Sequence, residues 1–169
     1  MGGALMSERD DSHDPIALRE RLEAARERLT RLPISRPRHA GSLDPSTGES
    51  WHRGNVLGHM SEMLPYWTDQ IRRAKAGSAR MGRDEEGAEQ RRQGIEQGDA
   101  ASEAELKRAV DRGIEGALKL MAKLTPEDMD RTVTFHNRDG DREVRVGELV
   151  QMLVVGHVEE HVQQLTDLS

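Results

Sequence analysis

Apolar residues recur at alternating steps of three and four in four stretches of this 169-residue chain, and this periodicity constrains the fold more than any other feature. The stretches cover residues 14–32, 51–76, 102–124 and 146–168. The first has its apolar residues at Leu18, Leu22, Ala25, Leu29 and Leu32. Arginine and glutamate occupy most of the positions between them, which gives the stretch one apolar and one charged face. The pattern predicts four amphipathic helices that bury their apolar faces against one another.

The segments between the helical stretches have contrasting compositions. Residues 33–50 contain three prolines, two glycines and four serines, which predicts a loop. Residues 77–101 are rich in glycine and charge, and their only large apolar side chains are Met81 and Ile95. We expect this segment to be a long crossover, partly helical and partly disordered. Residues 1–13 are polar and acidic and predict a flexible N-terminal tail before a domain at 14–169.

A short hairpin is predicted immediately before the last helix. Residues 132–136 and 142–146 alternate between apolar and polar side chains, and the segment between them contains Asp139-Gly140. An Asp-Gly pair between two alternating runs is typical of a β-hairpin. The predicted fold class is therefore all-α, a four-helix bundle with one long crossover and a short β-hairpin before the last helix.

The composition excludes several classes of function. The chain has no cysteine, so a disulfide framework is impossible and any bound metal must use nitrogen and oxygen ligands. Its formal charge of −6 argues against nucleic-acid binding, which depends on clustered lysine and arginine. No segment approaches the roughly 18 apolar residues of a membrane span. We expect a cytoplasmic protein that binds neither nucleic acid nor membranes.

Three histidines are the candidate metal ligands. His157 and His161 are four residues apart, so they stack on one face of the last helix, in the middle of its apolar stripe. His59 lies at the border of the apolar face of the second helix, beside Met60 and Met63. Two adjacent imidazoles in an apolar interior need polar partners and would repel each other if both were protonated. A shared divalent cation satisfies both conditions, while hydrogen-bonded core histidines are the alternative.

Other polar and aromatic residues surround these positions in the sequence. His52, Asn55 and Tyr66 lie on the same helix as His59 and are candidates for substrate binding, with capping or packing as the alternative. Trp51 begins that helix and is a candidate for supporting the ligands. Glu160 precedes His161 and is a candidate base or orienting group, or else a solvated charge on the helix surface.

Two segments of the chain resemble a known superfamily. The segment 50–60, which contains Trp51 and His59 and is followed by Tyr66-Trp67, resembles the second helix of the DinB-like (YfiT-like) metalloprotein superfamily. The hairpin and the segment 146–165, with His157 and His161, resemble its last helix. The most similar branch is that of the mycothiol-dependent maleylpyruvate isomerase N-terminal domain.

The resemblance implies an up-down-down-up bundle that forms homodimers and binds Zn²⁺ or Ni²⁺ through His59, His157 and His161. It also implies a low-molecular-weight thiol, such as mycothiol, as cosubstrate. Three imidazoles leave at least one metal position open, as in catalytic sites. The first hypothesis is a metal-dependent thiol S-transferase or isomerase that acts on a small electrophile. The alternatives are a noncatalytic, dimeric, metal-binding stress-response protein and a metal-dependent hydrolase.

Overall fold

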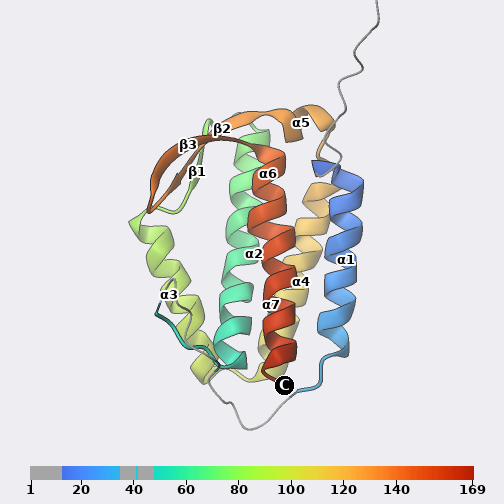
Figure 1. The fold of residues 1–169 in the computed structure, drawn as a ribbon, viewed down its shortest axis with the longest axis vertical. Helices are drawn as coiled ribbons and strands as arrows, with labels where there is room; N and C mark the ends of the chain where they lie inside the picture. Colours follow the sequence, from blue (N-terminus) through green and yellow to red (C-terminus); the bar gives the residue numbers. More distant parts are fainter. Residues whose placement is uncertain (1–12, 35–40, 42–47) are drawn as a thin grey trace, which may run out of the picture.

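Four long helices lie side by side in the computed structural model, which describes residues 13–34, 41 and 48–169 (Figure 1). The helices are α1 (Pro15–Arg31), α2 (Arg53–Lys75), α4 (Glu103–Met121), and a last helix made of α6 (Val146–Val150), the π-helical turn η2 (Gln151–Val155) and α7 (Gly156–Asp167). The four amphipathic helices that the sequence predicts are confirmed, and no described helix is long and apolar enough to cross a membrane. Most of the predicted tail and of the predicted 33–50 loop lies outside the described residues.

Side-chain caps determine where the helices begin. Asp14 accepts a hydrogen bond from the backbone N–H of Ala17, and Pro15 occupies the first position of α1. Ser102 and Glu105 form the capping box that the sequence predicts at the start of α4. Each cap pairs backbone N–H groups that a helix start leaves without partners. The local sequence therefore fixes these two boundaries.

A small sheet lies at one end of the helices (Figure 1). The predicted hairpin is confirmed: β2 (Thr132–Asn137) and β3 (Gly140–Arg145) pair in antiparallel register from Thr132–Arg145 to Asn137–Gly140. A third strand, β1 (Arg80–Gly82), pairs in parallel with β2. The domain is therefore mostly helical, as predicted, and its small sheet has one strand more than the predicted hairpin. The sequence does not predict β1, because a strand of three residues with a single buried side chain is too short to produce a detectable alternation.

Residues 77–101, which contain the unpredicted strand β1, differ from the prediction in one further respect. They are partly helical, as expected, because α3 (Glu85–Ala100) runs along α2, but the prediction of partial disorder is wrong. Glycines allow the two helix backbones to touch: an added Cβ at Gly58 would lie 2.3 Å from the Gly94 carbonyl oxygen. A Cβ at Gly98 would lie 2.1 Å from the Gly54 carbonyl oxygen. Contact of this kind needs no apolar side chain, so it leaves no periodic pattern in the sequence.

The first half of α2 is the most enclosed part of the domain. Every residue from Arg53 to Met60 is buried, because α3, α4 and α7 all pack against this helix. A helix that is covered on several sides differs from the half-exposed helix that its sequence pattern predicts. The side chain of His59 therefore lies in the interior rather than at the border of the apolar face.

We expect the substitution Gly98→Ala to destabilise the protein and Gly116→Ala to stabilise it. The Cβ at position 98 would collide with the backbone of α2, and overpacking of this kind costs about 1–3 kcal/mol. Gly116 lies inside α4 with no neighbouring atom within 4 Å of an added Cβ, so removing this glycine gains up to about 1 kcal/mol. Urea unfolding followed by circular dichroism measures both changes. A stabilising effect at both positions would contradict the backbone contact between α2 and α3.

Candidate metal centre

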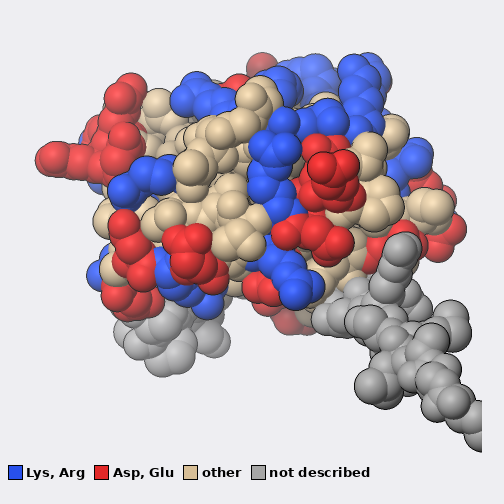
Figure 2. Space-filling model, turned by 90° about the horizontal axis from the view of Figure 1, so that it is seen from above, with Lys and Arg blue, Asp and Glu red and all other residues tan. Residues whose placement is uncertain are grey.

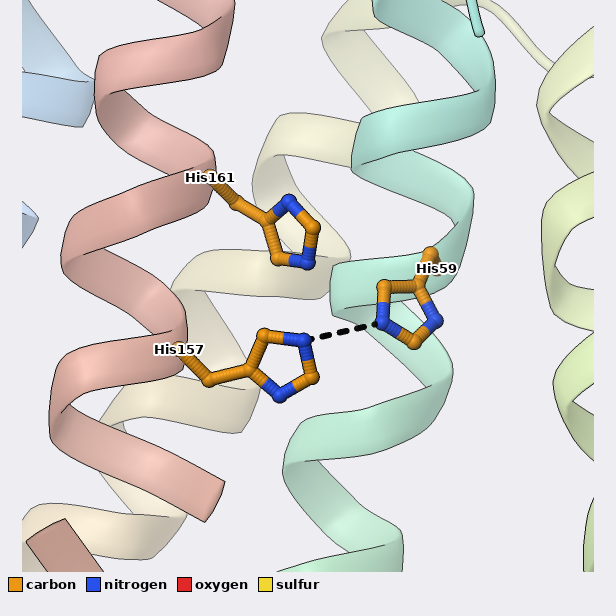
Figure 3. Close-up of side chains that lie close together, drawn as sticks. All are labelled: His59, His157 and His161. Atoms are coloured by element: carbon orange, nitrogen blue, oxygen red, sulfur yellow. Dashed lines mark hydrogen bonds between the residues drawn. The ribbon is translucent and has the colours of Figure 1, made fainter. Parts of the chain in front are cut away.

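The three histidines converge between α2 and α7 (Figure 3). One ring nitrogen from each of His59, His157 and His161 lies within 4.8 Å of the other two, and the Nε2 atoms of His59 and His157 are 3.3 Å apart. Among the histidine and acidic side chains of the described residues, these three histidines form the one group that could surround a metal ion. The structure thus brings together all three residues that the sequence singles out as ligands, from positions about one hundred residues apart.

A π-helical turn places the two histidines of the last helix. Gln151–Val155 form a π turn, in which the N–H of Gly156 bonds to the carbonyl oxygen of Gln151 five residues earlier. This wider turn shifts the apolar stripe that follows it, so its buried centre is Val158, Val162 and Leu165. The prediction from the sequence puts His157 in the middle of that stripe, because this prediction assumes a regular α-helix throughout. The two histidines instead lie one position before the centre of the stripe, on the side that faces His59 (Figure 3).

Burial keeps the three imidazoles neutral. His59 is 3% exposed and His161 is 9% exposed. Desolvation is the largest cause that lowers the pKa of each ring below its ordinary value of 6.5, and it lowers the pKa of His157 to about 3. Charges on neighbouring histidines and on Arg91 act in the same direction. Neutral imidazole is the form that binds a metal, so the protein holds the rings in the form that can coordinate.

The hydrogen bonds of the three rings fit a metal ion at their centre. The amide oxygen of Gln164 accepts from Nδ1 of His161 at 2.9 Å, and the side chain of His157 hydrogen-bonds to the backbone of Leu153. Nε2 of His161 is buried and has no hydrogen-bond partner among the described residues, and neither has Nδ1 of His59. An unpaired buried nitrogen costs free energy, and a cation at the centre would satisfy Nε2 of His161. Three histidine nitrogens are a ligand set for zinc or nickel.

Comparison with known proteins identifies the family. The family model of the DinB superfamily matches residues 17–165. The chain belongs to the DinB superfamily. The crystal structure of a mycothiol-dependent maleylpyruvate isomerase is similar to this DinB protein in fold, with a TM-score of 0.67 and 15% sequence identity. The similarity covers 91% of this chain and 60% of the isomerase chain, so this chain spans less than two thirds of that enzyme. No curated protein matches the chain.

Trp51 covers one side of the histidine group in this DinB protein. Its ring stacks on that of His161 at 5.9 Å between centroids and lies 5.2 Å from the ring of His59. The guanidinium of Arg91 lies 5.5 Å from the centre of the Trp51 ring and forms an ion pair with Glu49. The indole therefore excludes water from part of the centre and also lies within cation–π distance of a guanidinium. The supporting role that the sequence suggests for Trp51 stays a prediction.

A second arginine reaches the same region from the segment between β1 and α3. Arg83 binds the carboxylate of Glu62 through both guanidinium ends, at 2.8 and 2.9 Å, and lies 4.0 Å above the ring centre of Tyr66. Its charge is among those that lower the pKa of His59 and His157. Sequence reasoning missed Glu62, Arg83 and Arg91. Glu62 is one turn from His59 and could have been found by helical spacing, but nothing in the sequence of the crossover places the two arginines.

Three of the remaining candidates, His52, Asn55 and Tyr66, take part in contacts that support the fold. Nδ1 of His52 accepts from the backbone N–H groups of Gly54 and Asn55 at the start of α2. The side-chain oxygen of Asn55 accepts from the backbone N–H of His52, which completes a capping box. The Tyr66 hydroxyl donates to the carbonyl oxygen of Gly82 at 2.8 Å. Glu160 is exposed on α7. Substrate binding by His52, Asn55 and Tyr66, and a catalytic role for Glu160, stay predictions.

We expect the metal-free protein to lose stability as the pH falls below about 6.5. The unfolded chain takes up protons near the ordinary pKa of 6.5, whereas the pKa of folded His157 is about 3, so the unfolded state binds more protons in this interval. Each histidine that stays neutral contributes a slope of up to about 1.4 kcal/mol per pH unit. Urea unfolding at a series of pH values measures this slope. It should decrease in the His157→Leu variant, and an unchanged slope would contradict the burial of a neutral ring.

Proposed function

We propose that this DinB protein is a divalent-metal-dependent enzyme of the low-molecular-weight-thiol S-transferase or isomerase type, with His59, His157 and His161 as the ligands. The observation that carries the proposal is the convergence of three neutral imidazoles, two of them buried and that of His157 partly exposed, with one ring nitrogen of each within 4.8 Å of the other two. The buried Nε2 of His161 has no hydrogen-bond partner among the described residues. The mycothiol-dependent isomerase of similar fold supports a thiol as cosubstrate and a small electrophile as substrate. We also propose that the four long helices follow the up-down-down-up order of the superfamily.

The ligand set itself favours an anionic partner. Zn²⁺ or Ni²⁺ bound there would act as a Lewis acid and stabilise a thiol as its thiolate. In the described part of the chain the group contains no carboxylate, so the three neutral rings would leave the full charge of the ion in place. Trp51 restricts water on one side of the rings, and the guanidinium of Arg91 adds positive charge next to the indole. Both effects strengthen electrostatic attraction for an anion.

A noncatalytic metal-binding protein is the second candidate. The small exposed fractions of His59 and His161 favour it, because a centre that is closed to solvent can store a metal but cannot bind substrate. The partial exposure of His157 favours the enzyme instead, since it leaves one side of the group open. A homodimer and a cytoplasmic location stay predictions from the sequence, and a hydrolase remains the third alternative.

Metal content tests the ligand assignment. We expect untagged protein to contain close to one equivalent of zinc or nickel by elemental mass spectrometry, and the His157→Ala, His161→Ala double variant to contain almost none. His136→Ala is the matched control, because His136 lies on the exposed hairpin and pairs with Asp141. Wild-type protein that neither contains nor takes up a metal on titration would overturn the proposal, and the rings would then be core residues.

Thiol transfer tests the enzyme proposal against the second candidate. We expect metal-loaded protein to accelerate the reaction of mycothiol, bacillithiol or glutathione with a chromogenic electrophile such as 1-chloro-2,4-dinitrobenzene. The rate should fall at least about 100-fold when the metal is removed, because the thiolate is then no longer stabilised. Full metal occupancy with no thiol-dependent reaction would support the noncatalytic protein.

A further inference from the structure

We infer that Gln164 is a positioning residue for the metal centre, which aims Nε2 of His161 at the ion and, as a neutral amide, preserves the affinity of the ion for an anionic thiol. The inference rests on the proposed function, since it concerns the same centre. Gln164 lies three residues after His161 on α7, so both side chains are on one face of the helix. The distance from Nδ1 of His161 to the Gln164 amide oxygen is 2.9 Å.

The chemistry of this hydrogen bond fixes the tautomer of His161. An amide oxygen can only accept, so Nδ1 of His161 must carry the proton. Nε2 is then the nitrogen with a free lone pair, and it is the buried atom of this ring that has no partner among the described residues. The ring is also held between Trp51, at 5.9 Å between centroids, and His157, at 4.6 Å. Orientation and protonation are therefore both set before a metal binds.

The other two ligands are held differently. His157 bonds to the backbone of Leu153, in the π-helical turn, so no side chain supplies that contact. Nδ1 of His59 has no partner among the described residues. Of the side chains described around the three rings, Gln164 is the one that accepts a hydrogen bond from a ligand's distal nitrogen, and it can be changed without altering a ligand.

The neutral amide of Gln164 and a carboxylate at the same position would affect metal and thiol binding differently. A carboxylate acceptor raises the basicity of the histidine it binds and adds a negative charge to the centre. Both effects favour the cation but oppose a thiolate on the same ion. The Gln164→Glu variant should therefore bind metal at least as well as the wild type but bind a thiol more weakly. A residue that only packs against α7 would not separate the two affinities.

Three measurements on the full-length chain test this inference. Competition with a chelator should show Zn²⁺ and Co²⁺ bound about 10- to 100-fold more weakly by Gln164→Leu, and at wild-type strength or better by Gln164→Glu. In the Co²⁺ form, thiolate-to-metal absorption during titration with 2-mercaptoethanol should show weaker thiol binding by Gln164→Glu. Nitrogen-15 spectra of the metal-free protein should show Nδ1–H on His161 in the wild type and a mixture of tautomers in Gln164→Leu.

Gln163→Leu is the matched control. Gln163 is the neighbouring glutamine on α7, but its side chain bonds to Arg28 and Asp167 and not to a metal-binding ring. It should keep wild-type metal and thiol affinities, and thermal unfolding of both leucine variants establishes that they are folded. Wild-type affinities in Gln164→Leu, or parallel changes in metal and thiol affinity in Gln164→Glu, would overturn the inference. Wild-type protein without metal affinity would instead overturn the proposed function, and the tautomer of His161 in the metal-free protein would still report on Gln164.

Discussion

The domain depends on a buried arginine at the start of its central helix. Arg53 is 2% exposed, forms an ion pair with the carboxylate of Glu103 at the start of α4, and donates to the carbonyl oxygens of Leu165 and Pro33. A buried charge is tolerated only when such partners surround it. This one guanidinium therefore joins the end of α7, the segment after α1 and the start of α4 around α2. Because His59 lies less than two turns further along α2, its position relative to α7 follows from this arrangement.

Glycine contacts bring α3 against α2 as well. Gly54 and Gly58 on α2 meet Gly98 and Gly94 on α3 at backbone distance, which brings α3 against the same part of α2 that carries His59. The charged residues of the crossover thereby reach the centre, although they are distant from it in sequence. Acidic and basic side chains are interspersed over the surface at the sheet end of the molecule (Figure 2). The cations beside the histidines differ from these solvated charges because each contacts an aromatic ring and a carboxylate.

The histidine centre combines features that are costly in a core without a ligand. Three rings are held in the neutral form, close to one another, and two of their buried nitrogens have no partner among the described residues. A π-helical turn, which is rare in helices and frequent at functional sites, ends two residues before His157. The hydrogen bond from His161 to Gln164 sets the ring before any ion arrives. Preorganised imidazoles of this kind lower the cost of binding a metal, which is why we attribute function to this centre rather than to the hairpin or the surface.

The sequence by itself determined the features that depend on local spacing. The four helices, the capping box at Ser102 and the hairpin follow from periodicity and turn chemistry, and the four-residue step places His157 and His161 on one face. Only the tertiary structure decided that His59 meets them, that α3 covers α2, and that β1 adds to the hairpin. The physical reason is that helical periodicity records burial of apolar side chains, whereas these contacts are made by glycine backbones, a three-residue strand pair and polar side chains. Such contacts join residues far apart in the chain and leave no regular pattern along it.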